Sequence, residues 1–310
     1  MRRNDDWVLA ASIAGSMSAG VLLPSAGLIV EPYLLVWLGA LLFLNLIRLD
    51  SSDLVLTFTK PRQLVVLSII KLVVLPVAMY AIAYLVYRSF ALPVLLLSGI
   101  STGLGAPFVV NLIGGRLPLV VGMIITTSLA VPFILPSMVY TLAGSQFDIP
   151  VLQMMVLLVA ALFTPLAAGW FTKRYFPAVS KFADEKSFPL SLVFIILINF
   201  GMFARFSGYF YSEQTFLLQT VATAFICYAA YCLAGYGARG GRAEKTAGLI
   251  SLSYVNNVLV AVLALQFFGP EVAALAALYN IPYYAGIVAI KKIVLASSVP
   301  RKSPSSSRAA

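Results

Sequence analysis

The stretch Ser98-Gly-Ile-Ser-Thr-Gly-Leu-Gly-Ala-Pro-Phe-Val-Val-Asn-Leu-Ile-Gly-Gly-Arg-Leu-Pro118 decides how the rest of the chain is interpreted. It is apolar enough to lie in a bilayer, yet Gly103, Gly105 and Pro107 stand at its centre. Glycine weakens a helix, and proline removes a backbone donor and clashes with the preceding turn. Inside a membrane, an interrupted helix is tolerated only where it is buried in protein or lines a watery cavity. We therefore predict a broken membrane helix here, a feature that carriers use to hold ions and substrates.

The composition is that of a polytopic membrane protein. Of the 310 residues, 61% are hydrophobic and 10% are charged, which excludes a soluble domain. The chain has no histidine, so imidazole catalysis and imidazole metal ligands are excluded. Cys227 and Cys232 lie in one apolar run and indicate neither a disulfide framework nor a metal site. Because no pairing of a nucleophile with a base is visible, we do not expect an enzyme.

Ten apolar segments are each long enough to cross about 30 Å of hydrocarbon as a helix. They lie near residues 7–24, 31–48, 63–87, 91–113, 117–141, 149–171, 187–206, 215–237, 246–268 and 271–293. The first segment could instead be a cleaved signal peptide, but Asp5, Asp6 and its length argue against this. Residues 297–310 are rich in Ser, Pro, Lys and Arg, and we expect them to form a disordered cytoplasmic tail.

The basic residues set the orientation of these segments. With the N-terminus inside, 18 of the 21 Lys and Arg residues fall on the cytoplasmic side, and only Arg88 and Arg205 fall outside. The remaining one, Lys71, lies within the third segment. We therefore expect a multi-pass protein of the plasma (inner) membrane with both termini in the cytoplasm. The formal charge of +10 reflects this topology and does not indicate a nucleic-acid partner.

A weak internal repeat divides the chain into residues 1–143 and 144–296. The segment Ser251–Asn257 interrupts the ninth span about 150 residues after the break in the fourth, and Pro118 and Pro270 follow at nearly the same offset. Because five helices per unit is an odd number, the second unit must be inverted in the membrane. Inverted repeats with paired broken helices are a carrier architecture. We predict an all-α protein in which broken helices four and nine meet at mid-membrane.

Lys71 is the second unusual feature. It lies in the apolar run Ser68–Pro76, too deep to reach either membrane surface easily, and every Asp and Glu lies in a loop or at the edge of a predicted span. Ionisable residues at such depth are costly and mark candidate functional sites. Lys71 could carry a proton, offset the charge of an anionic substrate, or fill an ion site as a fixed cation. The alternative is a structural lysine that donates to the carbonyls of a broken helix and has no transport role.

Polar side chains near the two breaks are candidates for a cation or substrate site. They are Thr102, Asn111, Ser251, Ser253, Tyr254, Asn256 and Asn257. Such groups also commonly hydrogen-bond between membrane helices, and for any one of them that role is the simpler interpretation. For the Asn256–Asn257 pair at the break we favour a functional role.

The tenth span contains Tyr279-Asn280-Ile-Pro-Tyr-Tyr284, in which Pro282 should kink the helix. Tyr279 and Asn280 could then face the same cavity. Packing together with an interfacial aromatic belt explains the segment equally well. The run Thr126–Ser128 is interpreted as hydrogen bonding between helices.

Four places in the chain carry a recognisable pattern: Phe43–Asp53, Leu112–Arg116, Ser128–Pro136 and Asn280. In these places the sequence resembles the bile acid:sodium symporter family, within the superfamily that includes arsenite efflux carriers. The resemblance runs through nearly all ten spans. It implies a panel domain and a core domain, with broken helices four and nine crossing in the core. It also implies transport of an organic anion by alternating access.

Several departures fall where the resemblance places sodium ligands. A Ser-Asn pair in helix four is replaced by Ala106-Pro107. Hydroxyl residues early in helix five match Val120 and Ile124, which cannot bind a cation.

Helices nine and three depart further. In helix nine, the resemblance implies a glutamate followed by a Gln-Asn pair. The glutamate has no counterpart here, because residues 246–255 contain no carboxylate, and the pair is replaced by Asn256-Asn257. In helix three, the resemblance implies a glutamine that binds sodium five residues before a proline. The matching residue here is Lys71, five residues before Pro76. An ammonium group can satisfy the carbonyls that would bind a sodium ion. We therefore expect a divergent member with altered sodium sites.

These observations predict a secondary active transporter of a small organic anion in the lipid bilayer, independent of sodium and without a cofactor or metal. Lys71 either gains and loses a proton, which would couple transport to protons, or stays charged in an uncoupled carrier or exchanger. One alternative is a sodium symporter with a rearranged site, and another is a non-transporting membrane receptor or scaffold. Arsenite efflux is disfavoured because the broken core helix contains no thiol.

Overall fold

The computed structural model describes residues 3–47, 61–103, 105–144 and 149–296. The expected tail at 297–310 and the part of the Phe43–Asp53 motif that follows Ile47 lie outside the described residues. The described chain is all-helical, and its β-type pairing is an isolated antiparallel bridge between Thr102 and Val255.

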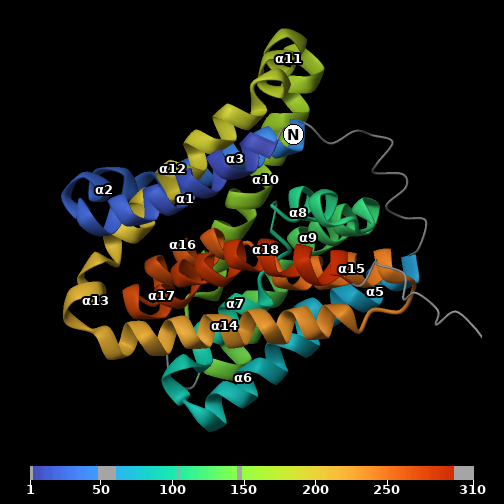
Figure 1. Cartoon of the computed structure of the whole chain (residues 1–310). Coiled ribbons are helices and arrows are strands. Elements are labelled where there is room, and N and C mark those ends of the chain that lie inside the picture. Colours follow the sequence, from blue (N-terminus) through green and yellow to red (C-terminus); the bar gives the residue numbers. More distant parts are fainter. Residues whose placement is uncertain (1–2, 48–60, 104, 145–148, 297–310) are drawn as a thin grey trace, which may run out of the picture.

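The helices follow one another along the chain and are labelled in Figure 1. They are α1 (Arg3–Leu22), α2 (Pro24–Val30), η1 (Glu31–Tyr33), α3 (Leu34–Ile47), α5 (Pro61–Ile69), η2 (Ile70–Val74), α6 (Leu75–Val86), η3 (Arg88–Phe90), α7 (Ala91–Gly99), α8 (Ala106–Ile113), α9 (Leu117–Ala143), α10 (Val151–Tyr175), α11 (Pro177–Glu185), α12 (Ser187–Arg205), α13 (Ser207–Ser212), α14 (Gln214–Tyr236), α15 (Arg242–Ser253), α16 (Asn257–Phe267), α17 (Pro270–Leu278) and α18 (Asn280–Ala296).

Among the described residues, six helical stretches are long and apolar enough to cross a membrane. They are Pro24–Leu44, Pro61–Val86, Leu117–Ala143, Val151–Tyr175, Ser187–Arg205 and Gln214–Tyr236. The predicted fourth, ninth and tenth spans are each divided into two shorter helices, α7 with α8, α15 with α16, and α17 with α18. The protein is therefore a multi-pass membrane protein built partly from interrupted helices.

The helices form two groups that pack against each other. The panel helices are α1, α2, α3, α10 and α12, and α12 contacts α1, α2 and α3. The core helices are α5 to α9 and α14 to α18, where α14 packs on α15, α6 on α7, and α16 on α17. Figure 1 shows α1, α3 and α12 running together along one side of the core helices. Contacts of α10 with α9, and of α3 with α16, join the two groups.

The two interrupted pairs, α7–α8 and α15–α16, have the same design. In each, a short helix ends, the described residues that follow it have no helical structure, and a second short helix begins. Gly114 follows α8 with φ of 91°, and Gly269 follows α16 with φ of 90°. Glycine adopts this left-handed conformation without the steric cost that a Cβ would bring. The next helix then has a proline in its first turn, Pro118 in α9 and Pro270 in α17.

The third predicted span contains one wide turn, the π-helix η2, between α5 and α6. It ends directly before Leu75-Pro76. Proline lacks a backbone N–H and its ring crowds the carbonyl four residues earlier, so a tighter α-turn is disfavoured here. Wide turns of this kind occur frequently at functional sites. Lys71 is the second residue of η2.

Candidate functional site

The breaks in the two helix pairs are joined by backbone hydrogen bonds. The N–H of Gly103 donates to the carbonyl of Tyr254 at 2.7 Å, and the N–H of Asn256 donates to the carbonyl of Ser101 at 3.0 Å. A Cβ at position 103 would lie 2.6 Å from the carbonyl oxygen of Val255, so only glycine allows this approach. The pairing satisfies polar backbone groups that an interrupted helix would otherwise leave without partners in the membrane.

Side chains complete the crossing. The hydroxyl of Thr102 donates to the carbonyl of Ser251 at 2.8 Å. The backbone N–H of Thr102 donates to the hydroxyl of Thr127 on α9 at 3.0 Å. Thr127 thus provides the interhelical hydrogen bond expected of its polar run, and it holds the break from the side of α9.

Lys71 is fully buried beside this crossing, with 0% of its surface exposed. Its Nζ donates to the carbonyl of Ser98 at 3.0 Å and, at the longer distance of 3.5 Å, to the carbonyl of Leu252. Ser98 lies in the last turn of α7 and Leu252 in the last turn of α15. Helix C-termini carry partial negative charge and unpaired carbonyls. The ammonium group therefore lies where the negative ends of two half-helices converge.

An aromatic ring covers the ammonium group. The centre of the Tyr231 ring lies 5.4 Å from Lys71 Nζ, within the range of a cation–π interaction. Tyr231 belongs to α14 and is fully buried, with its hydroxyl near the side chains of Cys227 and Ser98. The cluster of rings continues to Tyr279, 6.1 Å away, whose hydroxyl donates to the carbonyl of Ser253 at 2.7 Å.

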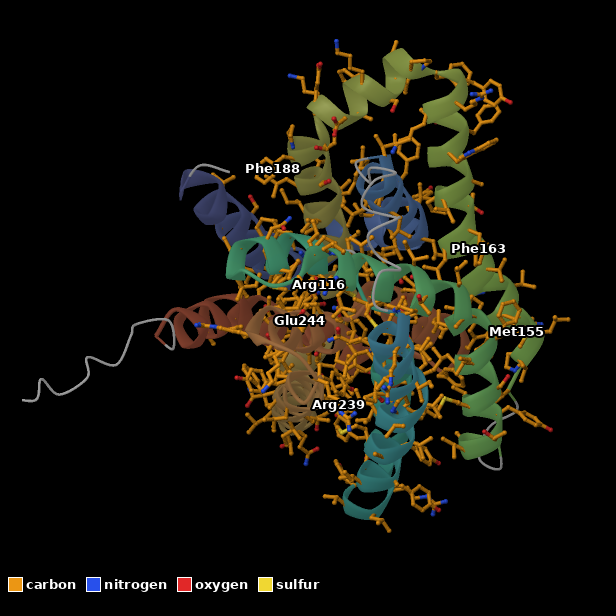
Figure 2. All side chains as sticks on the ribbon, turned by 90° about the vertical axis from the view of Figure 1, so that its right-hand side faces the viewer. Arg116, Met155, Phe163, Phe188, Arg239 and Glu244 are labelled. Atoms are coloured by element: carbon orange, nitrogen blue, oxygen red, sulfur yellow. The ribbon has the colours of Figure 1, made fainter. Side chains whose placement is uncertain are left out.

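A cavity of about 210 Å³ lies between the panel helices and the core helices. The described residues that line it include no Lys, Arg, Asp or Glu. Its wall is mostly apolar, with amide and hydroxyl groups on both the core and the panel side. The lining residues are Leu38, Leu41, Leu42, Gly103, Gly105, Phe108, Val109, Phe188, Ser191, Leu192, Ile195, Ile198, Asn199, Val255, Asn256, Asn257, Val258, Asn280, Tyr283, Tyr284 and Ile287. Phe188, at the beginning of α12, is labelled in Figure 2.

The cavity lies at the beginnings of α8 and α16. Gly105 precedes the first residue of α8, and Asn256 precedes the first residue of α16. The side-chain oxygen of Asn256 accepts a hydrogen bond from the backbone N–H of Leu259 at 3.4 Å. Helix N-termini carry partial positive charge and free N–H groups, and they attract anions. One set of half-helix ends therefore faces Lys71, and the opposite set faces the cavity.

A row of three asparagines crosses from the core helices to the panel helices. The Nδ2 of Asn257 donates to the carbonyl of Ala276 at 3.0 Å and to Oδ1 of Asn280 at 2.8 Å. The Nδ2 of Asn280 donates to Oδ1 of Asn199, on α12, at 3.1 Å. All three asparagines are buried and line the cavity.

The structure divides the residues singled out in the sequence into three sets. Those that line the cavity are Gly103, Gly105, Asn256, Asn257 and Asn280. Those buried around the crossing, away from the cavity lining, are Lys71, Thr102, Ser251, Ser253, Tyr254 and Tyr279. Pro107 occupies the first turn of α8, and Asn111 lies at an exposed position of that helix, away from the cavity lining.

The sequence analysis did not single out Asn199 or Tyr231. Asn199 could have been noticed, because it interrupts the apolar run Leu192–Met202, and a polar residue within a membrane helix usually has a partner in another helix. Tyr231 has no comparable signal, since it is one of 15 tyrosines in an aromatic-rich chain.

Interrupted membrane helices that meet at their breaks, with a cavity beside them, are characteristic of a membrane transporter. Comparison with known families agrees: the model of the sodium bile acid symporter family matches residues 35–213. This match covers more than half of the chain, and the protein belongs to the sodium bile acid symporter family. A search of curated proteins finds no match.

Proposed function

We propose that the protein is a secondary active transporter of a small organic anion that works without sodium. The observation that carries this proposal is the position of Lys71, whose Nζ is bonded to a carbonyl of each interrupted helix pair, Ser98 on one and Leu252 on the other. Lys71 is the coupling group or the charge-compensating group of the carrier.

The chemistry around Lys71 argues against a sodium ion at the same place. A cation there would need oxygen ligands, and the carbonyls of Ser98 and Leu252 already accept from the ammonium group. Two positive charges at one buried point would repel strongly in a medium of low dielectric constant. Glu244, the acidic residue of α15, is paired with Arg116 at 3.3 Å near the start of that helix. These contacts support transport that is independent of sodium.

The cavity supports an anionic substrate despite its uncharged wall. The N-termini of α8 and α16 supply partial positive charge and backbone N–H groups. A volume of about 210 Å³ is smaller than most drug-binding pockets, and the apolar wall suits a short hydrocarbon body. The substrate class is therefore a small anion with an apolar portion.

The proposed transport cycle uses the two helix groups. Residues 1–143 and 144–296 form two five-helix units of inverted topology, giving ten crossings and placing both termini in the cytoplasm of a plasma-membrane protein. The cavity lies between the panel and core helices, so relative movement of the two groups would open it to one side and then to the other. The shared design of the pairs α7–α8 and α15–α16 supports this architecture.

The test is uptake of labelled pentanoate and pentanesulfonate into proteoliposomes, with sodium and pH gradients imposed separately. The variants are Lys71→Ala and Lys71→Gln, and the matched control is Arg62→Gln, which removes an exposed basic residue of α5. Wild-type uptake should not respond to the sodium gradient. Both Lys71 variants should lose anion uptake, and Arg62→Gln should retain it.

The pH gradient separates the two roles of Lys71. Uptake that the gradient accelerates indicates a lysine that carries a proton, and uptake that it leaves unchanged indicates a fixed charge. Sodium-driven uptake that survives both Lys71 substitutions would overturn the proposal.

A further inference from the structure

The direction of the hydrogen bonds in the asparagine row is fixed at one end. The carbonyl of Ala276 can only accept, so the atom of Asn257 that faces it must be the donor Nδ2. That same Nδ2 also donates to Asn280, which orients Oδ1 of Asn280 toward Asn257. Nδ2 of Asn280 must then face Asn199, which accepts with Oδ1. The assignment of oxygen and nitrogen in all three amides therefore follows from one backbone carbonyl.

This order leaves a donor at the end of the row. Nδ2 of Asn199 is buried and makes no well-formed hydrogen bond to a described residue, although the hydroxyl of Tyr284 lies close enough to interact with it, and only 2% of the surface of Asn199 is exposed. A buried amide donor without a partner is costly, so a ligand that supplies an acceptor here gains affinity. Asn199 lines the cavity and projects from α12, a panel helix, whereas Asn257 and Asn280 belong to core helices.

We propose that Asn199 is a substrate-binding residue whose Nδ2 donates to an uncharged oxygen of the transported anion. The site accordingly selects anions that carry a second oxygen acceptor, such as a ketone carbonyl, in addition to the charged group. This inference rests on the proposed function, because it assigns the anionic group to the N-termini of α8 and α16. The charged group contacts the core helices, and the second oxygen contacts a panel helix.

The apolar wall around Asn199 makes this selection strong. Ile195 and Ile198 of α12 flank it in the cavity and offer no hydrogen bonds. A ligand that fills the cavity without offering an acceptor leaves this donor unsatisfied and gains no affinity from it. Sites built to bond a polar group discriminate strongly against analogues that lack it. Loss of one such bond corresponds to about a tenfold weaker affinity.

The experiment compares three acids with the same carbon chain: pentanoate, 2-oxopentanoate and 4-oxopentanoate. Binding of each to the purified full-length chain in detergent is measured by titration calorimetry. Wild type is compared with Asn199→Leu, which fills the site with an apolar side chain, and Asn199→Ala, which cannot overfill it. The control is Ile195→Ala, one helical turn away in the same wall. It should lower the affinity for all three acids by the same factor and keep the preference among them.

We expect wild type to bind at least one oxo acid about tenfold more tightly than pentanoate. Both Asn199 variants should lose this preference, whatever their affinity for pentanoate. A wild type without preference, a preference that survives both substitutions, or an equal loss for all three acids would overturn the role of Asn199. The wild-type comparison stands even if a variant fails to fold. If wild type binds none of the acids, the proposed function fails together with this inference. If wild type binds pentanoate and both oxo acids with equal affinity, this inference fails alone.

Discussion

The side-chain nitrogen of Lys71 lies 3.0 Å from the carbonyl oxygen of Ser98, at the C-terminal end of the first half of an interrupted helix. Its second, longer bond reaches Leu252 at the equivalent end of the other interrupted helix. One side chain from the π-turn of a third helix thus holds the two half-helix ends together. We therefore predict that transport and stability both depend on this ammonium group.

Substituting Lys71 by Met should lower stability. The Met side chain has a similar length but cannot donate, so the carbonyls of Ser98 and Leu252 would lose a partner, at about 1–3 kcal/mol each. The thermal unfolding midpoint of the purified protein measures the change, with Arg62→Met as the control. An unchanged or raised midpoint would show instead that the cost of burying the ammonium exceeds the value of its hydrogen bonds.

Substituting Gly103 by Ala should separate the two breaks. The added Cβ would lie 2.6 Å from the carbonyl oxygen of Val255, with no flexible side chain to yield. We expect a marked fall in the unfolding midpoint and loss of anion uptake. Gly15→Ala is the control, because a Cβ there meets nothing within 4 Å in helix α1 and should be neutral or slightly stabilising. Equal behaviour of the two variants would contradict the requirement for glycine at the crossing.

Gly105 and Tyr283 should show energetic coupling. A Cβ on Gly105 would collide with the hydroxyl of Tyr283, which packs against the start of α8. Gly105→Ala alone should therefore destabilise the protein, and Tyr283→Phe, which removes the hydroxyl, should recover part of the loss. A double-mutant cycle on unfolding midpoints measures the coupling. Strictly additive effects would mean that the two residues do not meet.

The ion pair between Arg116 and Glu244 should stabilise the corner between α8 and α9 against the start of α15. The two side chains lie 3.3 Å apart and are partly buried, and Figure 2 shows Arg116, directly before α9, next to Glu244 of α15. The backbone N–H of Arg116 also donates to the carbonyl of Ala243 at 3.2 Å. We expect Arg116→Gln and Glu244→Gln each to lower stability by about 1 kcal/mol or less, with no further loss when combined.

Salt provides an independent check on this pair. Raising the ionic strength should reduce the difference in unfolding midpoint between wild type and either single variant, because dissolved ions screen a partly exposed ion pair. A difference in unfolding midpoint that does not change with salt would indicate that the side chains act through packing.

Features that depend on local chemistry could be predicted from the sequence. The chain leaves the helix around Gly103 and again near Tyr254 because glycine, proline and polar side chains disfavour helix there, whatever surrounds them. Lys71 could be singled out because a lone charge in an apolar run is conspicuous without any structure. Membership of the sodium bile acid symporter family is expected from the spacing of the apolar spans and of the residues that interrupt them, and the family match confirms it.

Features that depend on packing could not be predicted. The bond between Asn280 and Asn199 joins residues 81 positions apart, and nothing near either residue specifies the other. The face of α8 that meets the core depends on where the helix begins, and Asn111 lies on the exposed side while Val109 and Val110 are buried. The division of the last span into α17 and α18 likewise places Asn280 at a helix start that periodicity alone does not define.

The bridge between Thr102 and Val255 consists of backbone groups on both sides. Apart from the need for glycine at position 103, its hydrogen bonds do not depend on which side chains flank them. A chain with this crossing can therefore exchange its ion ligands, gain a lysine or lose a carboxylate, and keep the same junction between its halves. The means of driving transport can then change through single substitutions on a scaffold that stays in place.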